Sequence, residues 1–293
     1  MSTRIRNTAP HGSTARSSLA RKSAWILHEV VDATPWSLSH RATLEQSESV
    51  SPAEFAVHST RPELSGYNRN FALGMLSREA EVGASVGHPH VLSTFMATDQ
   101  HDERQLIQPL LRRSPNSTNC APAVLWTIRQ IAEGLAAMHR ALWLHGDICP
   151  ASIVVEASGH ATLIHLGLAR QLHSEECDLA ATPLTGQLRY SAPEMFDDSG
   201  EVTSAVDIYS LGLVLFEMLA GRSVWNYEGP ELVAAKRLRA PEVRIPSSAI
   251  SFSLERLLVS MLAREPLRRP AAEEVAATLA ACEIATLSEW RAA

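Results

Sequence analysis

The stretch Trp143–Arg170, which reads W-L-H-G-D-I-C-P-A-S-I-V-V-E-A-S-G-H-A-T-L-I-H-L-G-L-A-R, decides the fold of this chain. It begins with a short turn around Asp147. Two strands are predicted after that turn, at Ile153–Glu156 and Ala161–His165, because both are short runs rich in branched apolar residues. Ser158-Gly159 lies between them and predicts a tight turn. The stretch therefore predicts a polar loop that leads into a β-hairpin.

The order of these residues resembles the catalytic segment of the eukaryotic-like protein kinases, which reads H-R-D-L-K-P-x-N and continues through a hairpin to D-F-G. His145, Asp147 and Pro150 match that pattern. The resemblance implies that Asp147 occupies the position of the catalytic base. Because most of the surrounding chemical groups are replaced, we interpret His145 and Asp147 as residues that hold the loop.

The remaining motif positions of this segment are substituted. Gly146 stands for the family arginine, Cys149 for the lysine, Ser152 for the asparagine, and His165-Leu166-Gly167 for D-F-G. Ser152 is a weak neutral ligand, and His165 offers an imidazole where Mg²⁺ prefers carboxylate oxygen. No metal is therefore expected at the two family metal positions, Ser152 and His165.

Three further motifs extend the resemblance toward the C-terminus. A-P-E is present at 192–194, D-x-x-S-x-G at 207–212 and P-x-x-R-P at 266–270. The family implies that Asp207 bonds the backbone of the catalytic loop and that Glu194 forms an ion pair with Arg269. These three residues are predicted to be structural.

The second half of the chain has the pattern of helices. From Ala123 onward, apolar residues recur at spacings of three and four, at Leu125, Ile128, Ile131, Leu135, Met138 and Leu142. We interpret this stripe as one face of a buried helix that leads into the catalytic loop. A second helix is predicted from Asp207 to Gly221, and a last one begins near Pro270, since proline suits a first helical turn.

The first half has the pattern of strands. Residues 25–64 alternate as W-I-L-H-E-V-V, L-S-H-R-A-T-L and E-F-A-V-H-S-T. The resemblance makes these the first strands of a small lobe, with its helix at Phe71–Gly87 and its last strand and hinge at Leu106–Leu111. The expected fold is α+β: a bilobal protein-kinase-like fold with a small antiparallel-sheet lobe and a larger helical lobe.

The nucleotide positions of the family are mostly degenerate in this chain. They fall on Asp32, Thr34, Ser37, His58, Glu79, Gln108, Leu111 and Ser152. The family's glycine-rich loop, whose glycines let backbone N–H groups close over phosphates, corresponds to 32–39, where no glycine remains. At ~5 Å and an effective dielectric of ~20, the Asp32 carboxylate would repel each phosphate charge by about 3 kcal/mol. Pro35 lacks a donor and Trp36 adds bulk.

His58 takes the position of the phosphate-pairing lysine, because F-A-V-H-S-T-R-P-E-L resembles the V-A-V-K-x-L-R-P-E-L of bacterial members. A second register would place Gly74 there, but the downstream spacing favours His58. An imidazole is mostly neutral near pH 7 and does not replace a permanent ammonium. Glu79, which pairs with the lysine in the family, is interpreted as a solvated helix charge.

Three glycines interrupt the predicted small-lobe helix, at positions 74, 83 and 87. Each costs about 1 kcal/mol relative to alanine inside a helix. The helix is therefore expected to be loosely held. Gly83 is also expected to leave a gap where the family places an apolar residue.

The segment between Gly167 and Ala192 corresponds to the activation segment. Ser174, Thr182 and Thr185 are candidate phosphorylation sites, and Gln187 replaces the threonine that touches the catalytic aspartate in the family. The arginine that would bind such a phosphate is replaced by a glycine. Phosphorylation is therefore not expected to order the loop by that route.

The predicted domain boundaries follow from these patterns. Residues 1–24 are basic, contain no acid and are expected to form a disordered tail, with a targeting peptide or a docking arm as the alternatives. The kinase-like domain is predicted at 25–285, with the small lobe at 25–111 and the hinge and large lobe at 112–285. Residues 286–293 are expected to be a C-terminal tail.

The composition is that of a globular protein, with 45% hydrophobic and 20% charged residues among 293. A net charge of -6 gives no reason to expect nucleic acid or an anionic membrane as partner. The four cysteines are widely spaced, and no apolar run approaches the ~20 residues of a membrane span. A reduced, cytoplasmic location without a membrane span is expected.

Three functions fit this sequence. The favoured one is a pseudokinase, a module that binds a protein partner, such as an active kinase or its substrate, in intracellular phospho-signalling. The second is a residually active serine/threonine kinase with Asp147 as base, the only one of the three that needs ATP and Mg²⁺. The third is a nucleotide or small-ligand sensor. We favour the first, without a cofactor, because phosphoryl transfer depends on charge neutralisation whose parts are replaced. A metal site at His58 and His165 has weak support, since no fixed spacing relates them.

Overall fold

The computed structural model describes residues 5–7, 25–44, 54–99, 103–114, 120–172, 188–196, 202–239, 241–243 and 251–292. The chain divides into two compact units, Met1–Gly87 with Leu92–Leu111 and His88–Val91 with Arg112–Ala293. The first unit contains an antiparallel sheet and one helix, and the second is mainly helical. The predicted α+β fold with a sheet lobe and a helical lobe is confirmed.

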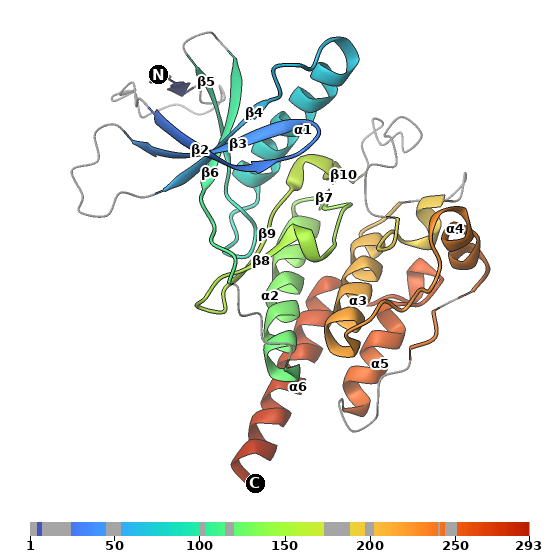
Figure 1. Ribbon diagram of the computed structural model, residues 1–293. Helices are drawn as coiled ribbons and strands as arrows, with labels where there is room; N and C mark the ends of the chain where they lie inside the picture. The colour runs from blue at the N-terminus through green and yellow to red at the C-terminus, as the bar shows by residue number, and fades with distance from the viewer. Residues whose placement is uncertain are drawn as a thin grey trace. The chain divides into compact units, whose positions relative to one another are not determined.

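The sheet of the first unit has the strand order β1-β5-β6-β4-β3-β2, and its pairs are antiparallel (Figure 1). The strands are β1 Ile5–Asn7, β2 Trp25–Ala33, β3 Ser37–Leu44, β4 Phe55–Thr60, β5 Phe95–Asp99 and β6 Arg104–Pro109. Buried residues from five of them form one cluster: Trp25, Ala42, Val57, Ala97 and Ile107. The alternation in the sequence thus corresponds to one buried face of the sheet.

Strand β1 departs from the disordered tail expected at residues 1–24. Ile5–Asn7 pair with the edge of β5, with Ile5 opposite Asp99 and Asn7 opposite Ala97. Pairing at a sheet edge uses backbone N–H and C=O groups, so it does not need a run of apolar side chains. The other residues of the predicted tail lie outside the described residues.

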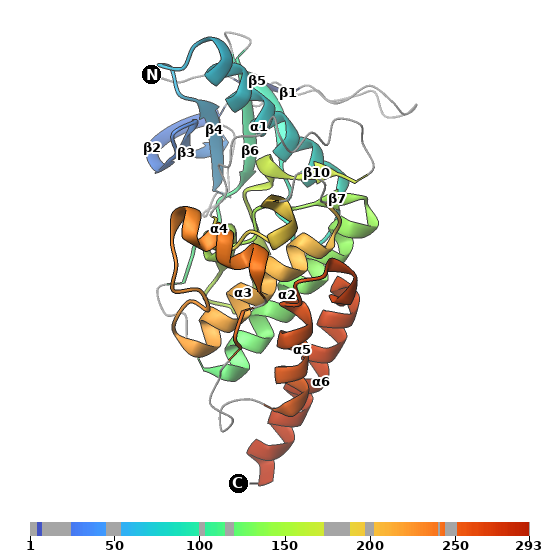
Figure 2. The same cartoon turned by 90° about the vertical axis from the view of Figure 1, so that its right-hand side faces the viewer.

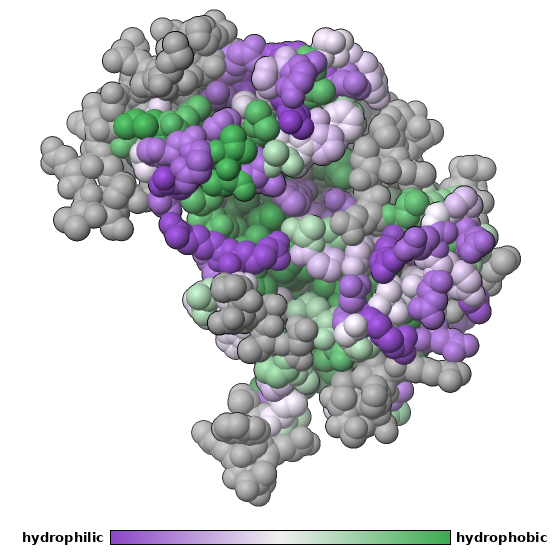
Figure 3. Space-filling model, in the orientation of Figure 1, coloured by the Kyte–Doolittle hydropathy of each residue, from purple (hydrophilic) through white to green (hydrophobic). Residues whose placement is uncertain are grey.

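Strand β2 lies at the opposite end of the described sheet. Val30 and Val31 near its end are 50% and 44% exposed, and hydrophobic residues gather over this sheet on the face drawn in Figure 3. The pairing of β2 with β3 shifts register on both sides of Val30. Such irregularities bend an edge strand and discourage other strands from pairing with it.

Helix α1, Gly66–Ser85, packs against β4, β5 and β6. The gap expected at Gly83 is wrong. A Cβ atom at Gly83 would lie 2.2 Å from Thr94 Oγ1 and 2.8 Å from the carbonyl oxygen of Leu92. Thr94 in turn donates a 2.7 Å hydrogen bond to the carbonyl of Glu79, one turn earlier in the helix. The glycine is therefore required by the close approach of α1 to the chain that enters β5.

Alanine substitutions at two glycines of α1 are expected to have opposite effects on stability. Gly83→Ala should lower the free energy of unfolding by about 1–2 kcal/mol, because overpacking against Thr94 outweighs the gain in helix propensity. Gly74→Ala is the matched control: a Cβ there meets nothing within 4 Å, so stability should rise by about 1 kcal/mol. Urea unfolding of both variants measures the difference, and equal effects would contradict the close approach at Gly83.

The second unit is built around a long helix, α2 Ala121–Arg140, which packs against α3 Ala205–Ala220 and α6 Ala272–Ala292. Helix α5, Phe252–Met261, contacts both α3 and α6, and α4 is Gly229–Leu238 (Figures 1 and 2). The short strands are β7 Trp143–Leu144, β8 Ile153–Val155, β9 Ala161–Leu163 and β10 Arg170–Gln171. Strands β8 and β9 form the predicted hairpin, and β10 pairs with β7.

The boundaries of several predicted helices differ from the structure. The small-lobe helix predicted at Phe71–Gly87 is observed as α1 Gly66–Ser85. The apolar stripe of α2 is buried as predicted, with Ile128, Ile131, Leu135 and Met138 fully inaccessible. Leu142 is the exception: it lies beyond the helix with a left-handed φ of 62° and is half exposed. Helix α6 continues to Ala292, so the chain after residue 285 begins as helix rather than as the expected tail. Periodicity marks a buried stripe but not the residue at which a helix ends.

None of the helices in the described part of the chain combines the length and the apolar character needed to cross a bilayer.

Candidate functional site

The loop around residue 147 is held by the buried carboxylate of Asp207, which stands in the first turn of α3. Asp207 accepts 2.9 Å hydrogen bonds from the backbone N–H groups of His145 and Gly146 and from Nε2 of His139. Burial alone would raise the pKa of this acid, but the bonds from His139 and the loop hold it below its ordinary value. Asp207 therefore acts as an ionised anchor for the loop, as predicted.

His145 closes the same loop from inside. The ring is fully buried; Nδ1 accepts from the backbone N–H of Asp147 at 3.2 Å, so Nε2 donates to the carbonyl of Ile164 at 3.0 Å. Burial lowers the pKa of His145, which keeps the imidazole neutral near pH 7. This geometry supports the interpretation of His145 as a loop-holding residue.

Ser152, at the position of the family asparagine, is turned into the loop. Its hydroxyl donates to the carbonyl of Cys149 at 2.9 Å and accepts from the N–H of the same residue at 3.0 Å. The side chain is fully buried within the turn Pro150–Ser152. Ser152 therefore closes a turn, and this role does not fit that of a ligand for a divalent cation.

His165, at the position of the family aspartate, has a left-handed backbone with φ 63° and ψ 51° just before the turn Leu166–Leu168. Its side chain is exposed. Imidazole suits transition ions, whereas Mg²⁺ requires oxygen ligands. Within the described residues no group of three or more His, Cys, Asp or Glu side chains is arranged to hold a metal ion. The residues at the family metal positions therefore do not fit Mg²⁺.

The turn between β2 and β3 satisfies its own hydrogen bonds through Thr34. The Thr34 hydroxyl oxygen accepts from the N–H groups of Trp36 at 3.2 Å and Ser37 at 2.9 Å. The N–H of Thr34 donates to the carbonyl of Ser37 at 2.9 Å, and Pro35 has no N–H. Every backbone donor from residue 34 to residue 37 is therefore used or absent in the place where the family binds phosphate.

The same turn is fastened to the rest of the first unit. The ring of Trp36 meets Phe71 of α1 edge to face, with 5.0 Å between centroids, and Phe71 stacks on Tyr67 at 6.4 Å. Arg61 bonds the turn twice, from its backbone N–H to the carbonyl of Trp36 and from its guanidinium to the carbonyl of Thr34. Asp32 is exposed and lies opposite Ser39 in the ladder. These contacts fasten the turn to α1 and to the chain that follows β4.

The other predicted nucleotide positions of the first unit lie on its sheet and helix. His58 is half-buried in β4, and its Nδ1 is 2.6 Å from the hydroxyl of Ser39. Glu79 is half-buried on α1, Gln108 pairs with Ala56 in the ladder, and Leu111 follows β6. The imidazole of His58 thus makes a hydrogen-bond contact with the neighbouring strand β3.

Comparison with known proteins identifies the family. Residues 65–279 match the protein kinase domain family. This chain belongs to the protein kinase family. Its relatives include three bacterial serine/threonine-protein kinases. PknA of Corynebacterium glutamicum is 29% identical over 256 residues, 80% of this chain and 52% of PknA. PrkC of Bacillus subtilis is 27% identical over 211 residues, 69% of this chain and 32% of PrkC. PkaB of Streptomyces coelicolor is 31% identical over 207 residues, 66% of this chain and 49% of PkaB.

Two facts limit what the family match transfers to this kinase domain. The chain spans about half or less of the length of these relatives. The matched residues begin at 65, after β4, so the strands that carry Asp32, Thr34, Ser37 and His58 lie before them. The family match is therefore carried by α1, β5, β6 and the second unit, and it does not include the nucleotide positions on β2, β3 and β4.

The kinase domain contains the predicted ion pair between Glu194 and Arg269. Both carboxylate oxygens accept from the guanidinium, one at 2.5 Å and the other at 2.9 Å, and the Arg269 side chain is completely buried. The other N–H groups of Arg269 donate to the carbonyls of Ala205, Ala263 and Arg264. All five donors of the guanidinium are thus satisfied, which makes the buried charge tolerable.

Loss of this arginine is expected to be costly. Arg269→Ala should lower the free energy of unfolding by about 3–5 kcal/mol, because it strands the buried Glu194 carboxylate. The neighbouring Arg268 is exposed and lies 3.8 Å from the exposed Glu265. Arg268→Ala is the matched control and should cost less than about 1 kcal/mol. Denaturant unfolding of the two variants compares them, and similar losses would contradict the assigned role of the pair.

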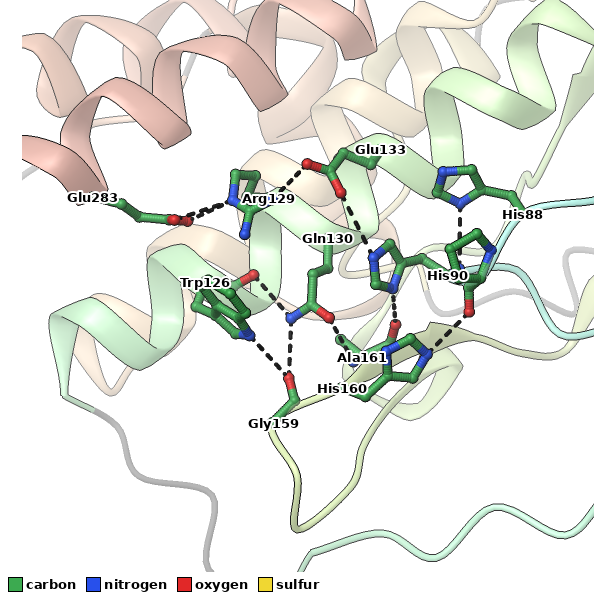
Figure 4. A network of polar contacts seen from close by, with 11 residues as sticks. His88, His90, Trp126, Arg129, Gln130, Glu133, Gly159, His160, Ala161 and Glu283 are labelled. Atoms are coloured by element: carbon green, nitrogen blue, oxygen red, sulfur yellow. Dashed lines mark hydrogen bonds and ion pairs between the residues drawn. The ribbon is translucent and has the colours of Figure 1, made fainter.

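Gln130 of α2 holds the β8–β9 hairpin in place (Figure 4). Its amide nitrogen donates to the carbonyls of Trp126 and Gly159, and its oxygen accepts from the N–H of Ala161. Trp126 also donates from its indole to Gly159 at 3.1 Å. The hairpin that follows the loop around Asp147 is therefore bonded directly to the central helix of the kinase domain.

Three histidines join the segment 88–91 to this hairpin (Figure 4). His90 donates from Nδ1 to the carbonyl of Ala161 at 2.8 Å, and its Nε2 lies 3.6 Å from Glu133. His160 donates to the carbonyl of Pro89 at 3.0 Å, and Nδ1 of His88 accepts from the N–H of His90. Burial lowers the pKa of both His88 and His90. Burial therefore favours the neutral form of the His88 and His90 imidazoles.

Acidification is expected to destabilise this cluster. A histidine whose pKa is lower in the folded chain than in the unfolded chain favours folding at neutral pH, and that contribution is lost as the pH falls below about 6.5. His90→Asn retains a donor for Ala161 but takes up no proton, so its stability should depend less on pH. Denaturant midpoints measured from pH 8 to pH 5 test this, and the same pH dependence in parent and variant would exclude His90 as a contributor.

Part of the predicted site lies outside the described residues. Ser174, Thr182, Thr185 and Gln187 belong to 173–187, so their roles stay predictions.

Gly146, at the position of the family arginine, has a positive φ of 75°, a backbone conformation that residues with a side chain rarely adopt.

Two side chains with defined positions give only weak signals in the sequence. The Thr34 hydroxyl precedes Pro35 in a T-P-W-S turn, a composition in which hydroxyls often bond nearby N–H groups. Lys236 is one of two lysines in a chain with 24 arginines, yet it is completely buried.

Proposed function

We propose that this protein kinase domain is a pseudokinase, a module that binds or regulates another protein in phospho-signalling and does not transfer phosphate from MgATP. The observation that carries the proposal is the turn between β2 and β3. Its hydrogen bonds to Thr34 use the donors that a phosphate would need. A phosphate group could bind the turn only after these internal hydrogen bonds had been broken, and breaking them costs free energy.

The metal side of the site supports the same proposal. Ser152 is bonded twice to Cys149, and His165 offers nitrogen instead of a carboxylate. Phosphoryl transfer depends on metal ions that neutralise the developing charge, and each tenfold loss of rate corresponds to ~1.4 kcal/mol of barrier. The frame around Asp207, Glu194 and Arg269 is kept. A retained scaffold without phosphate and metal groups suits a protein partner, such as an active kinase or its substrate, in the cytoplasm.

Titration with ATP, with and without Mg²⁺ or Mn²⁺, followed by thermal unfolding tests the proposal. A ligand at ~100 Kd would add about 2.7 kcal/mol to the free energy of unfolding. We expect no rise in Tm. A metal-dependent rise that His165→Ala abolishes would replace the proposal with a residually active kinase that uses Asp147 as base. A rise without metal would instead indicate a nucleotide sensor.

A matched pair of variants isolates the role of the turn. In a His58→Lys background, Thr34→Gly frees the N–H groups of Trp36 and Ser37, whereas Thr34→Ser keeps an oxygen in the same place. We expect the glycine variant to bind ATP more tightly than the serine variant in the same thermal assay. Equal binding by the two would show that the internal hydrogen bonds of the turn do not oppose the nucleotide.

A further inference from the structure

Lys236 of α4 is enclosed by backbone carbonyl groups. Its side chain is completely buried, and Nζ donates to the carbonyls of Leu188, Arg189 and Ser191 at 2.9, 2.8 and 2.7 Å. Among the described residues, no carboxylate lies within ion-pair distance of it. A buried ammonium that is bonded only to neutral oxygens is unusual, because buried charges are ordinarily paired with an opposite charge.

The carbonyls belong to one continuous segment. The remaining carbonyl of that segment, from Tyr190, accepts from the hydroxyl of Ser210 at 2.8 Å. Two side chains, Lys236 and Ser210, thus take up four consecutive carbonyls immediately before Ala192-Pro193-Glu194. The conformation of residues 188–191 therefore depends on the three N–H bonds that Lys236 supplies.

The choice of lysine at this position is specific. The chain contains 24 arginines and only two lysines, Lys22 and Lys236. Three carbonyls that converge on one point suit the three protons of an ammonium, whereas the guanidinium of arginine is a planar fork. Arginine also stays charged at every physiological pH, whereas a lysine can lose its proton. Lys236, the buried lysine among the described residues, thus stands where three carbonyls converge.

We propose that Lys236 is a proton-dependent latch: its ammonium form fastens residues 188–191 through three hydrogen bonds, and its neutral form releases one of the three carbonyls. A neutral amine has two N–H groups and cannot serve three acceptors. The carbonyl left over would be buried without a donor, which is costly enough to make the segment rearrange. The latch thus couples a single proton to the order of the chain before Glu194.

The surroundings of Lys236 place this change near neutral pH. Burial lowers the pKa of Lys236 to about 7, while the carbonyl contacts favour the charged form. The ring of Tyr209 lies 5.8 Å from Nζ, and the nearby chain carries the charged or phenolic side chains of Arg189, Tyr190 and Glu194. Those are already engaged, Arg189 with Glu228, Tyr190 with Glu217, and Glu194 with Arg269.

Lysine-selective ¹³C and ¹⁵N labelling of the full chain tests the latch directly by NMR. Only two side-chain signals are expected, and Lys22→Arg assigns them. Titration from pH 5 to pH 10.5 should show the Lys236 signal changing at least two pH units below the ordinary lysine value of about 10.4. A midpoint within about one unit of that value would mean that Lys236 is permanently charged and would overturn the proposal.

Amide hydrogen exchange connects the proton to the segment. After correction for intrinsic rates, protection at residues 189–192 should fall about tenfold or more between pH 6 and pH 9 in the parent. Lys236→Arg stays charged throughout; its planar fork fits the three carbonyls less well, so its protection should be lower than that of the parent at pH 6 but should not fall with pH. Lys236→Met should show low protection at both values. If the methionine variant does not fold, the arginine variant still decides. An equal fall in the parent and the arginine variant, or none in the parent, would refute the latch.

Discussion

The buried carboxylate of Asp207 is the constraint on which the helical unit depends. An ionised group with almost no access to water is tolerated only when its oxygens are fully hydrogen-bonded. The available donors are two consecutive backbone N–H groups, of His145 and Gly146, and the ring of His139. The loop must therefore turn back onto α3, and this places Asp147, the hairpin and the buried imidazole of His145 together.

The sequence predicted best those contacts in which a buried charge meets a fixed partner. Glu194 and Arg269 are 75 positions apart, yet both lie in short motifs whose spacing identifies them. The close approach at Gly83 could not be predicted in this way. Which backbone passes a helical glycine depends on how α1 packs, and nothing in the local sequence names Thr94 as the neighbour. The prediction that Leu142 belongs to the buried stripe was wrong for a related reason. Its spacing continues the stripe, but the helix ends two residues earlier, at Arg140.

The sequence predicted that phosphate-binding groups are replaced at the nucleotide positions. It did not predict the internal contacts that the replacements make. The absence of glycine between residues 32 and 39 predicts that a phosphate loop is missing. It does not show that the Thr34 hydroxyl collects the N–H groups of its own turn, because that depends on the turn geometry. The pairing of β1 with β5 could not be predicted from the sequence either. Three residues at a sheet edge are held by backbone hydrogen bonds, to which side-chain patterns give no guide.

The substituted residues at the family's ligand positions share one property: they form hydrogen bonds within the protein. Glycines, a lysine and an asparagine that serve a ligand contribute little to the stability of the empty domain, and groups of that kind are often kept at a cost in stability. Here their replacements bond within the protein: Thr34 to its turn, His58 to Ser39, and Ser152 to Cys149. Each exchange gives up a group that could contact phosphate or metal and gains an internal hydrogen bond worth about 1 kcal/mol. Under the proposed function, these internal bonds help the domain to hold a fixed surface for a partner instead of opening and closing around a nucleotide.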